Sequence, residues 1–174
     1  MAERVSVLIS EEEVSARMRE LGEIISQDYE GKQLHLVCVL KGGAYFMIEL
    51  AKYITGPVTI DFMSVSSYGS GTTSAGRVKI IKDLDEPVQG KDVLIVEDIV
   101  DSGRTLSCLK TLFESREPAS LSICTLLDKP SRREVEVDVE YVGFEIPDAF
   151  VVGCGLDFDQ RYRNFPYVGV VEFE

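Results

Sequence analysis

Histidine, tryptophan and cysteine are scarce in this chain of 174 residues, which has one histidine, no tryptophan and four cysteines. His35 lies inside the apolar run LHLVCVL, so any histidine base would have to come from that position. No two cysteines form a C-x-x-C pair; they stand at Cys38, Cys108, Cys124 and Cys154. These shortages argue against a zinc site and a Ser-His-Asp triad, and they favour reduced, buried thiols.

Long apolar runs and basic residues are also in short supply. No run approaches the roughly 20 residues that span a bilayer, and the first residues, MAERVSVLISEEE, lack a signal-peptide pattern. We therefore expect a cytoplasmic protein without a membrane partner. The 18 basic residues face 30 acidic ones, a net charge of -12, which also argues against a nucleic-acid partner. An anionic ligand would need local backbone donors, a few placed cations or a divalent metal.

The pattern of apolar residues indicates a single α/β domain over residues 1–174. Ser10 and Glu13 form a capping-box signature, and apolar residues then recur at helical spacing, which predicts a helix to about Tyr29. Continuous apolar runs at 34–40, 92–98 and 121–127 are typical of strands buried on both faces. Loops and helical patterns follow two of these runs. We predict an open, mostly parallel twisted sheet with helices on both faces.

Two further regions complete the predicted fold. Segments 58–65 and 77–81 alternate like the strands of a long hairpin, and we expect the Ser/Thr/Gly-rich segment 66–76 between them to be a mobile lid. Short strands are predicted after Lys129, at 139–144, 150–153 and 167–173. We expect a small hood, built mainly from about 130–165 and the N-terminal segment, with the last strand as a candidate for the edge of the sheet.

The segment EDIVDSGRT lies between a predicted buried strand and a helix. Free N–H groups at a helix N-terminus stabilise phosphate, Gly103 allows close approach, and Ser102 and Thr105 add hydroxyl donors. Glu97 and Asp98 would repel an anion but can accept hydrogen bonds from two vicinal ribose hydroxyls. The spacing suits a phosphorylated pentose. The alternative is that the acidic residues only cap the helix; a Walker loop and a dinucleotide fingerprint are both lacking.

Thirteen consecutive residues, VLIVEDIVDSGRT at 93–105, resemble the signature of the type I phosphoribosyltransferases, which bind phosphoribosyl pyrophosphate. Other segments resemble the hypoxanthine (hypoxanthine-guanine) branch in its shorter, bacterial form: VLKGG at 39–43, SVSSYGSGT at 64–72, LLDKPSRR at 126–133, YVGFEIPDAFVVGCGLDFDQRYR at 141–163 and YVGVVEF at 167–173. The resemblance implies Mg2+-dependent transfer of 5-phosphoribosyl to N9 of hypoxanthine, and of guanine, giving IMP or GMP and pyrophosphate in purine salvage. It also implies a homodimer or homotetramer.

The resemblance assigns the sugar phosphate and the reaction centre. The 5-phosphate residues are Asp101, Ser102, Gly103, Arg104 and Thr105. Glu97 and Asp98 hold the ribose, and together with Asp157 they are the expected Mg2+ ligands. Asp101 is also the expected general base, which takes a proton from the purine.

The same resemblance assigns the other two parts of the site. Pyrophosphate is expected at Lys41, Gly42 and Arg163, where the family's loop has a strained, often cis, peptide before the lysine. Lys129 is expected to donate to O6 of the purine, which selects 6-oxopurines. Phe150 is expected to stack on the base, with Val151 and Asp157 beside it. Ser67 and Tyr68 belong to the expected lid, which excludes water.

Two alternatives stay open. A relative that prefers xanthine or guanine would differ in contacts around C2, which the sequence does not display. A non-catalytic regulator that binds phosphoribosyl pyrophosphate and RNA on a related scaffold is the second. The acidic composition and the purine-type segment at Phe150 argue against it.

Overall fold

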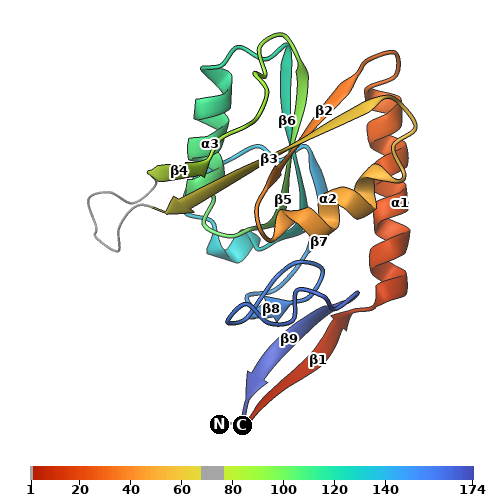
Figure 1. Ribbon diagram of the computed structural model, residues 1–174. Helices are drawn as coiled ribbons and strands as arrows, with labels where there is room; N and C mark the ends of the chain where they lie inside the picture. Colours follow the sequence, from red (N-terminus) through yellow and green to blue (C-terminus); the bar gives the residue numbers. More distant parts are fainter. Residues whose placement is uncertain (1, 68–76) are drawn as a thin grey trace.

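The computed structural model describes residues 2–67 and 77–174, and this part of the chain contains one six-stranded and one three-stranded sheet (Figure 1). The larger sheet has the order β4-β3-β2-β5-β6-β7. Its parallel strands are β2 (Leu34–Val39), β3 (Val58–Ser67), β5 (Asp92–Val100), β6 (Ser120–Asp128) and β7 (Tyr141–Glu145). β4 (Val78–Lys82) pairs antiparallel with β3, as predicted for the hairpin. The predicted α/β class with a mostly parallel sheet is confirmed.

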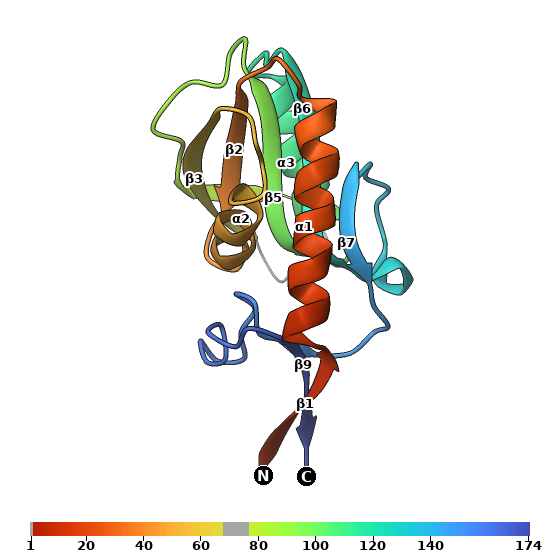
Figure 2. The same cartoon turned by 90° about the vertical axis from the view of Figure 1, so that its right-hand side faces the viewer.

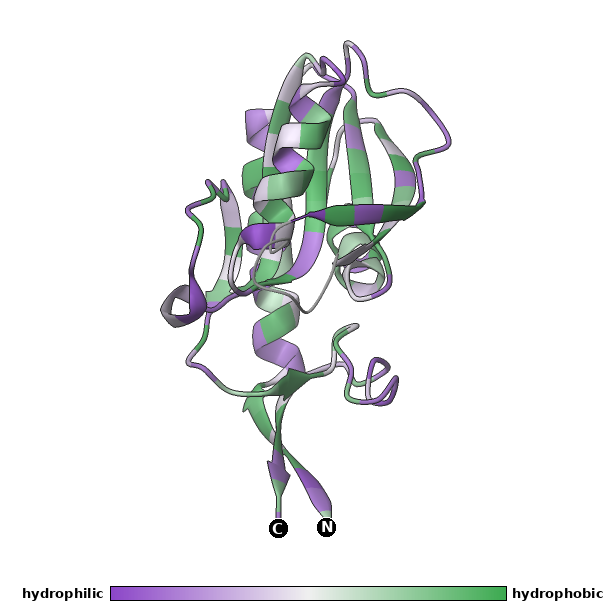
Figure 3. Ribbon diagram, turned by 90° about the vertical axis from the view of Figure 1, so that its left-hand side faces the viewer, coloured by the Kyte–Doolittle hydropathy of each residue, from purple (hydrophilic) through white to green (hydrophobic). Residues whose placement is uncertain are grey.

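Helices cover both faces of this sheet (Figures 1 and 2). α1 (Glu11–Asp28) and α2 (Gly43–Ala51) share one buried cluster with Leu94 and Val96 of β5, whereas α3 (Arg104–Glu114) shares the other with Val93 and Ile95. Successive side chains of a strand point to opposite faces. The apolar runs are therefore continuous, because both faces of the strands are buried, and Figure 3 shows green along the central strands.

The predicted elements hold with small shifts at their ends. The capping box at the start of α1 is present, with Ser10 Oγ accepting from Glu13 N at 3.2 Å and the Glu13 carboxylate accepting from Ser10 N at 2.8 Å. β5 continues through Ile99 and Val100, where the sequence predicts a loop. The reason is the register of its neighbour, because Val100 still pairs with Asp128 at the end of β6.

The hood strands required two corrections. Segment 139–144, expected in the hood, contains most of β7, which lies in the larger sheet and pairs parallel with β6. Segment 167–173, the candidate for the sheet edge, contains β9 (Val168–Phe173), which pairs instead with β1 (Glu3–Ile9) and β8 (Val151–Val152). The edge of β6 has unpaired backbone groups, which β7 satisfies by pairing with it. A short apolar pattern in the sequence does not reveal which strand pairs with that edge.

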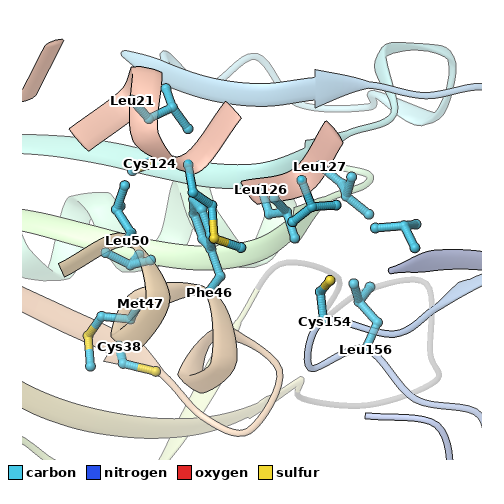
Figure 4. Close-up of a cluster of buried hydrophobic side chains, with 14 of the residues drawn as sticks. Leu21, Cys38, Phe46, Met47, Leu50, Cys124, Leu126, Leu127, Cys154 and Leu156 are labelled. Carbon is cyan, nitrogen blue, oxygen red and sulfur yellow. The ribbon is translucent and has the colours of Figure 1, made fainter. Parts of the chain in front are cut away.

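The smaller sheet packs on the same core as the larger one. The cluster under α1 and α2 also contains Cys154 and Leu156 from the loop after β8 (Figure 4). All four cysteines are free, as the sequence indicated; Cys38, Cys124 and Cys154 are buried, whereas Cys108 is only half-buried. Burial raises the pKa of the Cys38 and Cys154 thiols to about 12. None of the described helices is long and apolar enough to cross a membrane.

Candidate active site

The turn between β5 and α3 has the geometry of an anion site. Gly103 precedes α3 with φ 82°, a left-handed conformation that favours glycine, and a Cβ there would lie 2.5 Å from the carbonyl oxygen of Val135. The first turn of α3 contains no acidic residue, whereas that of α1 contains three. The partial positive charge at the N-terminus of α3 is therefore not offset by a carboxylate of that turn.

A cavity of about 110 Å³ lies over this turn. Its lining residues come from the end of β5 and the start of α3: Glu97, Ile99, Val100, Asp101, Ser102, Gly103, Thr105 and Leu106. The structure thus brings together four of the five predicted 5-phosphate residues. Arg104 contributes its backbone to the turn, with its N–H 3.3 Å from Ser102 Oγ, but its guanidinium forms an ion pair with Glu134 outside the lining.

A second cavity, of about 230 Å³, adjoins the first and shares Ile99 and Asp101 with it. Its lining contains all four predicted purine residues, Lys129, Phe150, Val151 and Asp157, together with Asp98, Ile99, Asp101 and Leu156. Lys129 lines this cavity and is only 8% exposed. Phe150 is 51% exposed and meets Phe158 edge-on at 5.6 Å between ring centroids. Its ring is accessible for stacking on a planar ligand.

Two adjacent carboxyl groups, Glu97 and Asp98, stand at the junction of the sheet and the turn. Desolvation raises the pKa of Glu97 well above its ordinary value, and the charge of Asp98 raises it further. Desolvation also raises the pKa of Asp98, although the N–H of Ile99, at 2.7 Å, and the charge of Arg163 favour its ionised form. A ligand that donates hydrogen bonds or a cation would stabilise both groups as carboxylates.

Gly42, a residue of the predicted pyrophosphate site, lies between β5 and the loop after β8. The peptide bond between Leu40 and Lys41 is cis. A Cβ built on Gly42 would come within 1.8 Å of Asp98 Oδ2, and one built on Gly155 would come within 2.1 Å of the carbonyl oxygen of Gly42. The loop therefore packs tightly against β5 on one side and against the loop after β8 on the other, and both contacts require glycine.

Gln160, which the sequence analysis did not single out, joins the predicted pyrophosphate cations. Lys41 Nζ and an Arg163 guanidinium nitrogen both donate to Gln160 Oε1, each at 3.1 Å. Arg163 also forms an ion pair with Asp157 at 3.2 Å, and Asp157 accepts from the Gln160 N–H at 2.8 Å. Lys41, Asp157 and Arg163 thus meet in one cluster. The only sequence signal for Gln160 is its place between Asp157 and Arg163.

The carboxylates suit a magnesium ion that arrives with a polyanion. Among residues 2–67 and 77–174, no group of three or more His, Cys, Asp or Glu side chains could hold a metal ion. Glu97, Asp98 and Asp157 therefore form no protein cage. Magnesium is usually bound by one or two carboxylates together with water and substrate phosphate oxygens. The residues present fit that mode of binding, in which a pyrophosphate would supply the remaining oxygen ligands.

The described residues include only the first part of the expected lid. Ser67 is exposed at the end of β3 and pairs with Val78 of β4. Tyr68 and residues 69–76 of the predicted lid lie outside the described residues.

Comparison with known proteins places this site in a family. Residues 9–159 match the phosphoribosyl transferase domain. The chain is 56% identical to the hypoxanthine phosphoribosyltransferase of Salmonella typhimurium over 173 residues, which cover 98% of this chain and 97% of the relative. It is 49% identical to the hypoxanthine-guanine phosphoribosyltransferase of Streptococcus thermophilus over 168 residues, covering 97% and 93%. A solved hypoxanthine-guanine phosphoribosyltransferase of Bacillus anthracis superposes with a TM-score of 0.93 at 44% identity, covering 99% and 100%.

Proposed function

The chain belongs to the phosphoribosyl transferase family, and from that premise we propose that it transfers 5-phosphoribosyl from phosphoribosyl pyrophosphate to N9 of hypoxanthine and guanine. In this reaction the bond from C1 to pyrophosphate breaks, the bond from C1 to N9 forms, and the purine loses a proton. One observation carries the proposal: the two adjoining cavities at the carboxyl ends of the parallel strands share Asp101. Ligands of open α/β sheets bind at this end.

The smaller cavity suits the ribose 5-phosphate. Ser102, Gly103 and Thr105 surround the position where the N-terminus of α3 stabilises an anion. Glu97 and Asp98, just before them, would accept hydrogen bonds from the ribose 2- and 3-hydroxyls. Hydroxyl donors also favour the ionised forms of these two carboxyls, whose pKa values are raised by desolvation.

The larger cavity suits a 6-oxopurine. Lys129 would donate to O6, Phe150 would stack on the ring, and Val151 would bind its edge through backbone groups. The ammonium group of Lys129 gains little from the exocyclic amine of adenine, because that amine cannot accept a hydrogen bond from it. The specificity for 6-oxopurines therefore rests on Lys129.

Pyrophosphate leaves toward the cluster of Lys41, Gln160 and Arg163. The two cations come from distant segments and are held 3.1 Å from one amide oxygen, so their charges face the same region. They would stabilise the negative charge that develops on the leaving group. When bound, Mg2+ would neutralise further charge there. Glu97, Asp98 and Asp157 are the residues that would hold it, together with phosphate oxygens of the substrate.

Asp101 is the proposed general base. It lines both cavities, which supports a role between the proposed sugar-phosphate and purine sites. In this position it would accept the proton that the purine loses as N9 attacks C1.

A steady-state assay with hypoxanthine, guanine, xanthine and adenine, each with phosphoribosyl pyrophosphate and Mg2+, tests the function. We expect turnover of hypoxanthine and guanine, and none of adenine. Preferential turnover of xanthine would place the chain in the alternative specificity class. Binding of phosphoribosyl pyrophosphate without turnover of any base would support a non-catalytic regulator and defeat the proposal.

We propose further that the enzyme is a cytoplasmic homodimer or homotetramer that acts on small molecules and binds neither nucleic acid nor membrane. The net charge of -12 supports the last two points. Sedimentation equilibrium of the full chain would distinguish the two assemblies, and a monomer would contradict both.

A further inference from the structure

A segment that no substrate assignment includes, residues 132–135, runs along the turn 101–104. The backbone N–H groups of Glu134 and Val135 both donate to the carbonyl oxygen of Ser102, at 2.9 and 3.1 Å. The Glu134 carboxylate forms an ion pair with Arg104, and the carbonyl oxygen of Val135 lies close to Gly103. Ser102, Gly103 and Arg104 thus each have a contact in this segment. The conformation of the turn depends on residues about 30 positions later in the chain.

Arg132 extends these contacts to Asp101. Its Nε lies 3.4 Å from Asp101 Oδ1, and its NH1 lies 3.6 Å from Asp148 Oδ2. Asp148 is two residues before Phe150 in the sequence. One guanidinium group therefore connects the turn at the start of α3 with the segment that leads to the proposed purine-stacking residue. It contacts one oxygen of the Asp101 carboxylate, Oδ1.

The backbone that presents Arg132 is itself fixed. The short 3-10 helix η1 (Pro130–Arg132) begins directly after Lys129, and the Arg132 N–H donates to the Lys129 carbonyl oxygen at 3.0 Å. The Lys129 N–H donates in turn to the carbonyl oxygen of Val100, at 3.0 Å. Proline at the first position of η1 restricts φ and favours the start of the helix. Arg132 is therefore anchored to the same two strand ends that supply Lys129 and Asp101.

We propose that Arg132 is a positioning residue for Asp101, which limits the rotation of that carboxylate and keeps its second oxygen available for the purine. The inference rests on the proposed role of Asp101 as general base. A planar guanidinium can contact two carboxylates at once, which an ammonium group does less well. Side chains of Arg132, Asp101 and Asp148 are each about half exposed, so the effect of losing the contact is modest. We expect about a three- to fivefold change in rate, the upper range for an exposed ion pair.

Single-turnover rates at saturating phosphoribosyl pyrophosphate and hypoxanthine test this role, because product release does not limit them. Arg132→Gln should slow the single turnover about three- to fivefold. Its KM for phosphoribosyl pyrophosphate, measured separately in the steady state, should stay within about twofold. Arg132→Lys should restore at least half of the lost rate. Asp148→Asn should produce a smaller loss in the same direction. Lys52→Gln, which removes the same charge from an exposed pair with Glu49, is the matched control and should behave like the unchanged enzyme.

The decisive measurement is the double variant with Asp101→Asn. If Arg132 acts through Asp101, then Arg132→Gln should cause no further loss in the Asp101→Asn background. An equal loss in both backgrounds, or an unchanged single turnover in Arg132→Gln alone, would overturn the inference while the proposed function stands. An unchanged turnover in Asp101→Asn alone would instead count against Asp101 as the base. The three results are distinguishable in one set of measurements.

Discussion

The carboxylate of Asp98 lies directly against Gly42, so that a Cβ at position 42 would come within 1.8 Å of Oδ2. The proximity of these two residues follows from the topology, because β2 and β5 are neighbouring parallel strands whose carboxyl ends meet at the same edge of the sheet. The proposed ribose and pyrophosphate sites are therefore in physical contact. A change in the pyrophosphate loop should alter the position of the ribose carboxylate.

Gly42→Ala tests that contact. The added methyl group must displace the Asp98 carboxylate or the loop by more than an ångström, because real Cβ contacts lie beyond 3.0 Å. Misplacement on this scale can cost about 10²-fold in rate, and we expect kcat/KM for phosphoribosyl pyrophosphate to fall by about that factor. Initial-rate kinetics would measure the loss. Gly56→Ala, where the nearest atom is 3.8 Å away, is the matched control. Equal activity in both variants would contradict the prediction.

The sequence was sufficient to predict most of the sheet. The runs around Leu36, Leu94 and Cys124 are apolar on both faces. This pattern is typical of a parallel sheet that is covered by helices on both sides. The placement of the Tyr141 and Val168 strands could not be predicted in this way. Both are short, and which free edge a short strand joins depends on the three-dimensional position of that edge.

The candidate site was predictable to a similar degree. Local signals mark the turn at Asp101–Thr105, because a strand end, a glycine and a helix start adjoin in sequence. Gln160 and Arg132 give no such signal. Gln160 joins Arg163 to Lys41, which lies about 120 residues earlier in the chain. Arg132 contacts Asp101 and Asp148 because of its position at the end of η1. Contacts of this kind are set by tertiary structure alone.

Lys129→Ala should remove the preference for 6-oxopurines. Lys129 is 8% exposed and lines the larger cavity, and a hydrogen bond to a charged donor contributes about 1.5 to 3 kcal/mol. We therefore expect kcat/KM for hypoxanthine and guanine to fall by about 10- to 150-fold, with the KM for phosphoribosyl pyrophosphate nearly unchanged. Rates measured with each base would show this. Lys32→Ala, at an exposed position before β2, is the control. A fall in kcat/KM for phosphoribosyl pyrophosphate alone, with the values for the bases unchanged, would place Lys129 at the sugar phosphate instead.

Removal of magnesium should abolish turnover without destabilising the free protein. The described residues contain no group of acidic or other ligands that could hold a metal alone, so the ligand-free chain should gain little stability from the ion. We expect a chelator to stop catalysis reversibly and to shift the Tm of the free protein by less than about 1 °C. Differential scanning calorimetry beside the activity assay would test both points. A clear fall in Tm on chelation would indicate a metal site within the protein that the structure does not account for.

His35 should make the stability of the fold depend on pH. Desolvation lowers the pKa of His35, and the positive charge of Lys91 lowers it further. His35 is 3% exposed; its Nδ1 lies 2.7 Å from Thr59 Oγ1, and its Nε2 has no hydrogen-bond partner among the described residues. The unfolded chain, with an ordinary histidine pKa of about 6.5, then binds more protons than the folded chain as the pH falls below about 7. The free energy of unfolding should decrease over that range, because protons favour the unfolded state.

The single histidine makes this prediction simple to measure. Urea unfolding at pH 7.5 and pH 5.5 gives the change in free energy of unfolding for the unchanged chain and for His35→Leu. The carboxyl groups titrate in both chains, so subtracting the variant isolates the histidine. The unchanged chain should lose more stability than His35→Leu between the two values. The NMR signal of the only imidazole should also titrate below the ordinary histidine range, because its neutral form is favoured. Equal losses in the two chains, together with an ordinary titration of the ring, would show that burial does not suppress its charge.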